Sequence, residues 1–389
     1  MKIYHCVESY FPSVGGMQEV VRQLSERMAK AGHEVYVLTR HHPERKSNEW
    51  NGVRIVEFKV DGNPFIATTE EEIRYVNYLL SIEGDIVSFF AAQQWATNLA
   101  LDILKEIRAK KISVPTGYSG LYKPEYNSYF LKMKEWIHGY DMNVYLSDDY
   151  RDINFARECG VDKIMLIPNG ASEEEFLEYK GPDIKKKFNI PAHHKILLHV
   201  GSYSGRKGHK ECLELFLRAN LKNTTLLLIG NGISYFFRRS IFKYPILLSR
   251  ILFSYFSSKK IVFIEADRST TIAAYFQSDI FLFPSQVECS PIVLFESSAA
   301  GLPFLTTDVG NAREIVKWTE GGEIMETRMN EEGFAVPEYE TAVRQLENFM
   351  NDGERLKQYS LSGRIAWKHS FTWEQISSRY LELYTKLLS

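Results

Sequence analysis

Two glutamates, Glu288 and Glu296, are the side chains of this sequence best suited to chemistry. From Cys289 to Leu305, Glu296 is the only charged residue, and its neighbours are apolar or small. A carboxylate on such a helix is shielded from water and needs a polar partner, which the hydroxyls of a ribose would provide. Glu288 lies in the loop before that helix, where a solvated acid is the alternative interpretation. Their spacing of eight positions across a helix start predicts that both are functional.

Two glycine-containing loops are candidates for phosphate binding. Gly15 and Gly16 stand directly before a predicted helix, where free amides and the helix dipole favour an anion. The loop from Gly201 to Gly208 adds the positive charge of Arg206 and Lys207, a combination suited to a diphosphate. A simple turn and a solvated basic loop are the respective alternatives.

Metal-dependent phosphate binding is not indicated. The basic loop lacks the P-loop spacing, and the sequence contains no D-x-D motif. We therefore expect no metal site and no cofactor.

The elements that must position these residues alternate between strands and helices. Residues 2–7 predict a strand, 18–31 a helix and 35–38 the next strand, which together make a βαβ unit. A second series starts at 196–200 and includes later strands at 225–229, 261–264, 280–283 and 303–306. The class is therefore α/β, with two doubly wound halves joined near Ile167-Pro-Asn-Gly. Ligands of such sheets bind beyond the carboxyl ends of the strands, and two facing domains would enclose a cleft.

Composition excludes several other classes of protein. The 389 residues carry 47 basic and 49 acidic side chains, which argues against a strongly basic nucleic-acid binder. Four cysteines without C-x-x-C spacing suggest neither a zinc site nor a disulfide framework. The N-terminus lacks a signal-peptide pattern, and no run of eighteen uncharged apolar residues occurs. We expect a cytoplasmic protein.

With these motifs assembled, the chain resembles the family-4 retaining glycosyltransferases, which have two Rossmann-like domains facing a central cleft (GT-B). The resemblance runs over almost the whole length. It rests on the two glycine loops, the 167–170 turn, the 279–285 strand and loop, the glutamate pair, and the closing Phe371-Thr-Trp-Glu segment. The expected domains are an acceptor-side domain at 1–170, a nucleotide-sugar-binding domain at 171–370, and a C-terminal helix at 371–389 that packs back toward the first domain.

The resemblance also implies residue roles. Glu288 would face the donor sugar, Glu296 would bind the ribose hydroxyls, and Arg206 and Lys207 would stabilise the departing diphosphate. Catalysis is assigned to Glu288, Lys207 and Arg206. The implied donor-binding residues are Gly15, Gly16, Gly201, Ser202, Arg206, Lys207, Asn231, Glu288, Cys289, Ser290, Pro291, Ile292 and Glu296.

Two positions depart from the family pattern. Ser202 stands where the family usually has arginine, a change for which Arg206 is the nearby candidate to compensate. The loop that usually supplies a histidine in the first domain reads Val114-Pro-Thr-Gly-Tyr-Ser-Gly-Leu-Tyr. Thr116, Gly117 and Tyr118 are therefore expected on the acceptor side.

Residues 233–260 combine six basic residues and eight aromatics with no acid. This composition suits an anionic lipid surface, whereas packing of the apolar side on the second domain is the alternative. The membrane interpretation predicts a peripheral protein at the inner face of the membrane.

The function expected from these observations is retaining transfer of a hexose or N-acetylhexosamine. The donor would be a nucleotide diphosphate sugar, with a UDP-sugar favoured, and the acceptor a glycan or a lipid-linked molecule in cell-envelope polysaccharide or lipopolysaccharide synthesis. Nucleic acid is not an expected partner. Two alternatives remain: a nucleotide-sugar epimerase on the same two-domain plan, and a catalytically inert nucleotide-sugar-binding protein.

Overall fold

The computed structural model describes residues 1–236 and 258–389. The chain divides into two compact units. Unit 1 comprises Met1–Asn169 together with Trp373–Ser389, and unit 2 comprises Gly170–Thr372. Unit 2 is thus inserted into the sequence of unit 1.

Unit 1 is built on an eight-stranded sheet with the strand order β3-β4-β2-β1-β5-β6-β7-β8. All neighbouring strands pair in parallel except β3, which runs antiparallel to β4. The central strands β1 and β5 are buried almost throughout because a parallel sheet is covered on both faces. The strands are β1 (Lys2–Cys6), β2 (Glu34–Arg40), β3 (Glu49–Trp50), β4 (Val53–Phe58), β5 (Ile86–Phe90), β6 (Lys110–Val114), β7 (Met142–Tyr145) and β8 (Ile164–Leu166).

The longer helices of unit 1 bury one face each. Helix α1 (Gly16–Lys30) buries Val20, Val21, Leu24 and Met28, which lie on one face at helical spacing. The other helices are α2 (Glu70–Leu80), α3 (Trp95–Asn98), α4 (Asn127–Trp136), α5 (Arg151–Glu158) and α16 (Trp373–Leu388), with short 3₁₀ turns at Leu101–Ile103, Pro124–Tyr126 and Ile137–Gly139.

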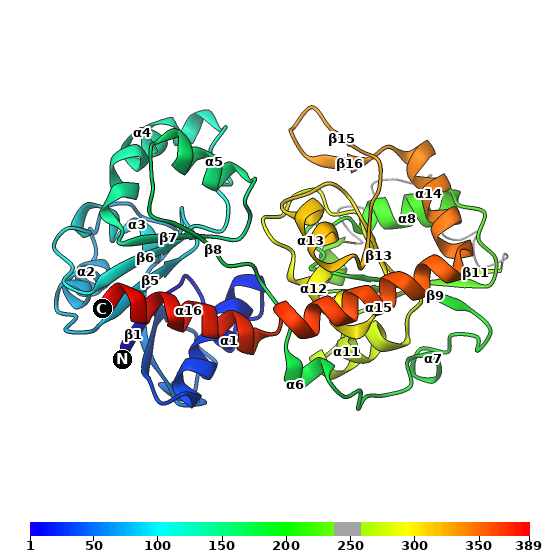
Figure 1. Cartoon of the computed structure of the whole chain (residues 1–389), viewed down its shortest axis with the longest axis horizontal. Helices are drawn as coiled ribbons and strands as arrows, with labels where there is room; N and C mark the ends of the chain where they lie inside the picture. The colour runs from blue at the N-terminus through cyan, green and yellow to red at the C-terminus, as the bar shows by residue number, and fades with distance from the viewer. Residues whose placement is uncertain (237–257) are drawn as a thin grey trace. The chain divides into compact units, whose positions relative to one another are not determined.

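Helix α16 joins unit 1 from the far end of the sequence. It packs along α1 (Figure 1). Beneath it, the hydroxyl of the buried Tyr384 lies 2.9 Å from Ser88 Oγ and 3.3 Å from His5 Nε2. The other ring nitrogen of His5 lies 2.7 Å from Ser25 Oγ on α1. This buried polar chain ties the last helix to β1, β5 and α1.

Unit 2 has a parallel six-stranded sheet with the order β11-β10-β9-β12-β13-β14. Its strands are β9 (Lys195–Val200), β10 (Thr224–Ile229), β11 (Lys259–Ile264), β12 (Ile280–Phe283), β13 (Phe304–Thr306) and β14 (Gly322–Ile324). A separate antiparallel hairpin pairs β15 (Thr327–Met329) with β16 (Ala335–Pro337).

Helices cover both faces of this second sheet (Figure 1). Alternate residues of one strand point to opposite faces, so Leu197 and Leu282 enter one hydrophobic cluster, whereas Leu198 and Phe281 enter the other. The helices are α6 (Glu173–Phe176), α7 (Ile184–Lys187), α8 (His209–Arg218), α9 (Ile233–Phe236), α11 (Arg268–Gln277), α12 (Ile292–Ala300), α13 (Ala312–Thr319), α14 (Tyr339–Asn351) and α15 (Gly353–Ser370).

Both sheets confirm the predicted α/β class with two doubly wound halves. In each unit the first strand lies inside the sheet, and the strand order reverses beside it, between β1 and β5 and between β9 and β12. Such a reversal separates the loops that follow the two strands and leaves room for a ligand at their carboxyl ends. The loops after β9 and β12 carry Lys207 and Glu288, so these residues lie at the reversal point of unit 2.

Hydrogen bonds join the first and last residues of unit 2. The amide of Ala171 donates to the carbonyl of Phe371 at 3.0 Å, and Ala171 forms a parallel bridge with Thr372. The indole of the buried Trp367 donates to the carbonyl of Ala171 at 3.0 Å.

Candidate active site

The loop after β9 is held against the loop after β12 by close backbone contact. Gly208 has φ +84°, and a Cβ there would lie 2.2 Å from the carbonyl oxygen of Pro284. Only glycine fits this position without a shift of the backbone. Alongside it, the amide of Gln286 donates to the carbonyl of Arg206 at 3.0 Å. The two candidate loops therefore form one local structure.

Lys207 and Glu288 meet across these loops. The Lys207 ammonium lies 2.7 Å from Oε1 and 2.8 Å from Oε2 of Glu288. Ser285 Oγ also donates to Glu288 Oε1, at 2.8 Å. The Glu288 side chain is 10% exposed and that of Lys207 is 34% exposed. An enclosed carboxylate needs such partners because loss of water is costly for a charge.

A third loop supports the residue after Glu288. Gly310 has φ +57°, and a Cβ there would lie 2.3 Å from the carbonyl oxygen of Cys289. That same carbonyl accepts a hydrogen bond from the amide of Asn311 at 2.9 Å. The backbone leading from Glu288 into α12 is thus fixed before the helix begins. Pro291 is the N-cap of α12, and Gly301 ends the helix with φ +67°.

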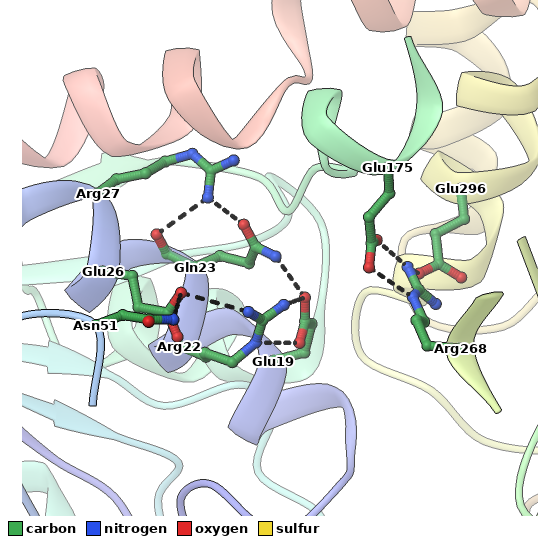
Figure 2. A network of polar contacts seen from close by, with 9 residues as sticks. All are labelled: Glu19, Arg22, Gln23, Glu26, Arg27, Asn51, Glu175, Arg268 and Glu296. Atoms are coloured by element: carbon green, nitrogen blue, oxygen red, sulfur yellow. Dashed lines mark hydrogen bonds and ion pairs between the residues drawn. The ribbon is translucent and has the colours of Figure 1, made fainter. Parts of the chain in front are cut away.

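Glu296 lies on α12 and is buried. Its Oε1 accepts a hydrogen bond from Arg268 Nη2 at 2.6 Å, and Arg268 also binds Glu175 on α6 (Figure 2). The sequence predicted that Glu296 is shielded from water, which is confirmed by a side-chain exposure of 6%. Its ionic partner, Arg268, was not predicted from the sequence. The only available signal was a basic residue that follows a capping Asp267 at a helix start.

Arg206 faces different partners from its neighbour Lys207. Its guanidinium lies 3.2 Å from Glu332 and 3.3 Å from the side-chain oxygen of Gln286, and 3.8 Å from the ring centroid of Phe334. The structure therefore does not bring Arg206 to Glu288. Its assignment to the diphosphate stays a prediction.

Ser202 and Asn231 lie on adjacent loops at the same edge of the sheet. The amide of Tyr203 donates to the carbonyl of Asn231 at 2.9 Å. A Cβ on Gly230 would lie 1.9 Å from the carbonyl oxygen of Gly201, so the loops after β9 and β10 are in contact. Both Ser202 and Asn231 are exposed.

In unit 1, Gly15 is the N-cap of α1 and Gly16 is its first residue. The first turn carries Glu19, which accepts hydrogen bonds from Arg22 at 2.8 Å and from Gln23 at 2.6 Å (Figure 2). The acid at this helix start is thus paired within its own helix. The anion-binding role of Gly15 and Gly16 stays a prediction.

The predicted acceptor-side residues follow β6. Thr116 and Gly117 have φ +57° and +85°, and the Gly117 amide donates to the buried Asp152 carboxylate at 2.7 Å. Tyr118 is buried, with its ring against Phe130 and Phe155. Its side chain is therefore part of the core, and a surface contact at this loop would come from its neighbours.

Sequence analysis missed the matching loop after β5. Ala91 and Gln93 have φ +65° and +62°, which is unusual for residues with a side chain. The Gln93 side chain accepts a hydrogen bond from the Gly120 amide at 3.0 Å and so joins the loops after β5 and β6. Strained backbone of this kind often accompanies ligand sites. The sequence Ala91-Ala-Gln-Gln contains no glycine that would have indicated it.

Two buried histidines lie behind the basic loop of unit 2. His199 on β9 has its Nδ1 2.9 Å from the carbonyl oxygen of Leu282, and its ring centroid lies 4.4 Å from that of His209. Burial lowers the pKa of His199 to about 4. Burial also lowers the pKa of His209 well below its ordinary value. Both rings are therefore neutral near pH 7.

Among residues 1–236 and 258–389, no three His, Cys, Asp or Glu side chains are grouped as metal ligands. In the same described ranges, the helices are too short or too polar to cross a bilayer. Most of the 233–260 segment, including Arg238, Arg239 and Lys243, lies outside the described residues.

The sequence matches two family models, one in each half of the chain. The model of Glycosyltransferase Family 4 matches residues 14–175, and that of Glycosyl transferases group 1 matches residues 181–365. N-acetyl-alpha-D-glucosaminyl L-malate synthase of Bacillus anthracis is 22% identical, over 97% of this chain and 96% of that protein. The lipopolysaccharide glucosyltransferase WaaG of Escherichia coli is 25% identical, over 79% of this chain and 81% of its own.

A solved structure shares the fold. Anabaena Alr3699/HepE in complex with UDP-glucose superposes with a TM-score of 0.73 at 16% identity, covering 99% of this chain and 100% of that one.

Proposed function

Because the chain belongs to the family-4 glycosyltransferases of the GT-B architecture, we propose that it is a retaining enzyme with a nucleotide diphosphate sugar as donor. It moves a hexose or N-acetylhexosamine to a glycan or lipid-linked acceptor in cell-envelope polysaccharide or lipopolysaccharide synthesis. The observation that carries this proposal is the Lys207–Glu288 pair at the strand-order reversal of unit 2.

The pair supplies two charges that the reaction needs. Transfer develops positive charge at the sugar ring and negative charge on the departing diphosphate. The Glu288 carboxylate stabilises the first, and the Lys207 ammonium stabilises the second. The two groups neutralise each other, so the site carries both charges without leaving either unpaired.

The bond changes follow from a front-face reaction. The bond between the anomeric carbon and the diphosphate oxygen breaks, and the acceptor oxygen bonds to the same carbon on the same face. The proton of the acceptor hydroxyl passes to the released diphosphate. No residue of the protein has to act as the base. The deeply buried His199, whose pKa burial lowers, is assigned to packing.

The names of the related proteins favour a UDP-sugar. HepE was solved with UDP-glucose, WaaG is named a glucosyltransferase, and the Bacillus relative is named for an N-acetylglucosaminyl product. We accordingly assign the donor to unit 2, with Glu296 on the ribose and the start of α12 at Cys289–Ile292 near the sugar and phosphates. The acceptor is assigned to unit 1, at the loop with Thr116 and Gly117.

A peripheral membrane contact belongs to the same proposal. It rests on the composition of residues 233–260. Within the described part of that stretch, the Lys260 ammonium donates to the backbone carbonyls of Phe188 and Asn189. Lys260 therefore serves unit 2, and the membrane role falls to Arg238, Arg239 and Lys243.

The test is a transfer assay with UDP-, GDP- and ADP-sugars, each with and without a mixture of glycan and lipid-linked acceptors. We expect an acceptor-dependent product whose new linkage keeps the anomeric configuration of the donor, read by NMR. An inverted linkage would contradict the retaining mechanism. A changed sugar formed without any acceptor would favour the epimerase, and binding without either product would favour the inert binding protein.

A further inference from the structure

Arg268 connects Glu296 to a second acid. Its Nε lies 3.0 Å from Oε1 of Glu175, and its Nη2 contacts Oε2 of the same carboxylate, so the pair is bidentate. The same Nη2 donates to Glu296 Oε1 at 2.6 Å. A guanidinium nitrogen carries two hydrogens, and here each is directed to a different carboxylate. Figure 2 shows the three side chains converging from α6, α11 and α12.

Each member of this triad comes from a fixed backbone. Arg268 is the first residue of α11, whose N-cap Asp267 accepts a hydrogen bond from the Thr270 amide at 2.7 Å. Glu175 precedes the fully buried Phe176, which anchors the short helix α6 in the core. Glu175 thus holds the planar guanidinium through Nε and Nη2, and Nη2 also donates to Glu296.

The Arg268–Glu175 pair by itself adds little to stability. Arg268 is 42% exposed and Glu175 is 21% exposed, and ion pairs of that exposure contribute little to folding. Glu296, at 6% exposure, is the member for which orientation matters. A bidentate clamp on the cation fixes the plane and direction of the enclosed carboxylate, as a support residue does for a binding group.

We propose that Arg268 is a positioning residue for the donor ribose: held by Glu175, it orients Glu296 so that the enzyme distinguishes nucleotides with ribose hydroxyls from those without. This inference rests on the proposed function, because it takes Glu296 as the ribose-binding group. It adds two residues, Arg268 and Glu175, and a selectivity that the glutamate pair alone does not specify.

The experiment compares the binding of UDP with that of 2′,3′-dideoxy-UDP, which lacks both ribose hydroxyls, by calorimetry. We expect the wild type to bind UDP about tenfold tighter or more, as for hydrogen bonds to a charged group. Arg268→Gln should bring the ratio close to one by weakening UDP while leaving the dideoxy nucleotide nearly unchanged. Glu296→Gln should do the same, and the double variant should show no further loss, because both changes act through one group.

Two graded variants keep the test valid if Arg268→Gln does not fold. Arg268→Lys retains the charge but loses the bidentate guanidinium, and Glu175→Gln weakens the ion pair with Arg268. Each variant should therefore give a ratio of UDP to dideoxy-UDP affinity between those of the wild type and Glu296→Gln. The control is Arg355→Gln. Arg355 is 44% exposed, forms an ion pair with Glu323 at 2.6 Å and follows an Asp N-cap in α15, so it matches Arg268 in setting.

The outcomes separate the two proposals. If Arg268→Gln weakens both nucleotides equally, or if the ratio is unchanged in all three Arg268 and Glu175 variants, the triad is only structural and the inference is wrong. If the wild type binds UDP and 2′,3′-dideoxy-UDP equally while transferring sugar, Glu296 does not bind the ribose hydroxyls. If the wild type binds no nucleotide diphosphate and transfers no sugar, the proposed function itself fails.

Discussion

The ammonium of Lys207 lies within hydrogen-bonding distance of both carboxylate oxygens of Glu288, at 2.7 and 2.8 Å. These residues are 81 positions apart in the sequence, and they meet because their strands, β9 and β12, are neighbours in the sheet. In the proposed reaction the diphosphate would bind Lys207 and the sugar would face Glu288, so donor binding would change the contacts of both members of the pair.

Replacement of Glu288 by Gln should lower turnover more than donor affinity. The amide keeps the shape of the side chain but loses the charge that stabilises a cationic sugar, so we expect kcat to fall about 100-fold or more with a small change in donor KM. The control is Glu332→Gln, which removes the partner of the adjacent Arg206. A rise in KM with kcat intact would instead assign Glu288 to ground-state binding.

Replacement of Glu296 by Ala should weaken nucleotide-sugar binding by about 1 to 3 kcal/mol. The ribose hydroxyls lose their acceptor, and the site that the carboxylate filled becomes a polar gap. Calorimetry with the donor measures this, and Glu323→Ala, which breaks the Arg355 pair in the same unit, is the control. Donor affinity equal to that of the wild type would contradict the ribose role.

Transfer should continue in EDTA. The proposed partner of the diphosphate is the Lys207 ammonium on the loop after β9, which would supply the positive charge that a metal supplies in other enzymes. Initial rates with and without chelator measure this. Inhibition that magnesium or manganese reverses would show that the loop is insufficient. Lys207→Ala, by contrast, should lose activity that neither metal restores.

The free energy of unfolding should fall as the pH is lowered from about 6.5 to about 4. Burial lowers the pKa of His199 to about 4 and that of His5 to about 3, so the unfolded chain takes up protons in this range and the folded chain does not. The stabilisation is complete above the unfolded pKa and is lost as the pH falls toward the folded one. Each such histidine contributes a slope of about 1.4 kcal/mol per pH unit.

Urea titrations at several pH values test this slope. His199→Gln keeps a donor for the Leu282 carbonyl and removes the titrating ring, so the slope should decrease. Phe283→Leu alters the ring that stacks on His199 at 5.7 Å without removing a titrating group. It should lower stability and leave the slope as in the wild type. An unchanged slope in His199→Gln would contradict the assignment.

Vesicles containing anionic lipid should bind the protein at low salt. Arg238, Arg239 and Lys243 would contribute about 1 kcal/mol each near such a surface. Co-sedimentation measures the binding, and changing these three residues to Ser should abolish it. Lys260 is left unchanged because its ammonium is held by backbone carbonyls in unit 2. Absence of wild-type binding at every salt concentration would eliminate the membrane role and favour a soluble acceptor.

Hydrophobic periodicity was sufficient to predict the fold class and several of the strands and helices. The strand predicted at residues 2–7 is Lys2–Cys6, and the helix predicted at 18–31 is Gly16–Lys30. These features are local, because apolar spacing and a glycine at a helix end act within a few residues. The burial of Glu296 was also predictable for this reason, since the side chains around it in the sequence are apolar or small.

The partners of the candidate residues were not predictable in this way. Arg268 is 93 positions from Glu175 and 28 from Glu296, and only the packing of three helices brings them together. Neighbours in sequence can also face different surroundings. Arg206 contacts the hairpin residues Glu332 and Phe334, whereas Lys207 contacts Glu288.

The insertion of unit 2 into the sequence of unit 1 has a consequence for how the protein is made. A chain emerges from the ribosome with its N-terminus first, and domains generally fold as units while synthesis proceeds. All of Gly170–Thr372 is synthesised before α16, whose Tyr384 completes the buried chain with His5 and Ser88. The unit that begins first is therefore finished last, and a frameshift after Thr372 would damage the first domain rather than the second.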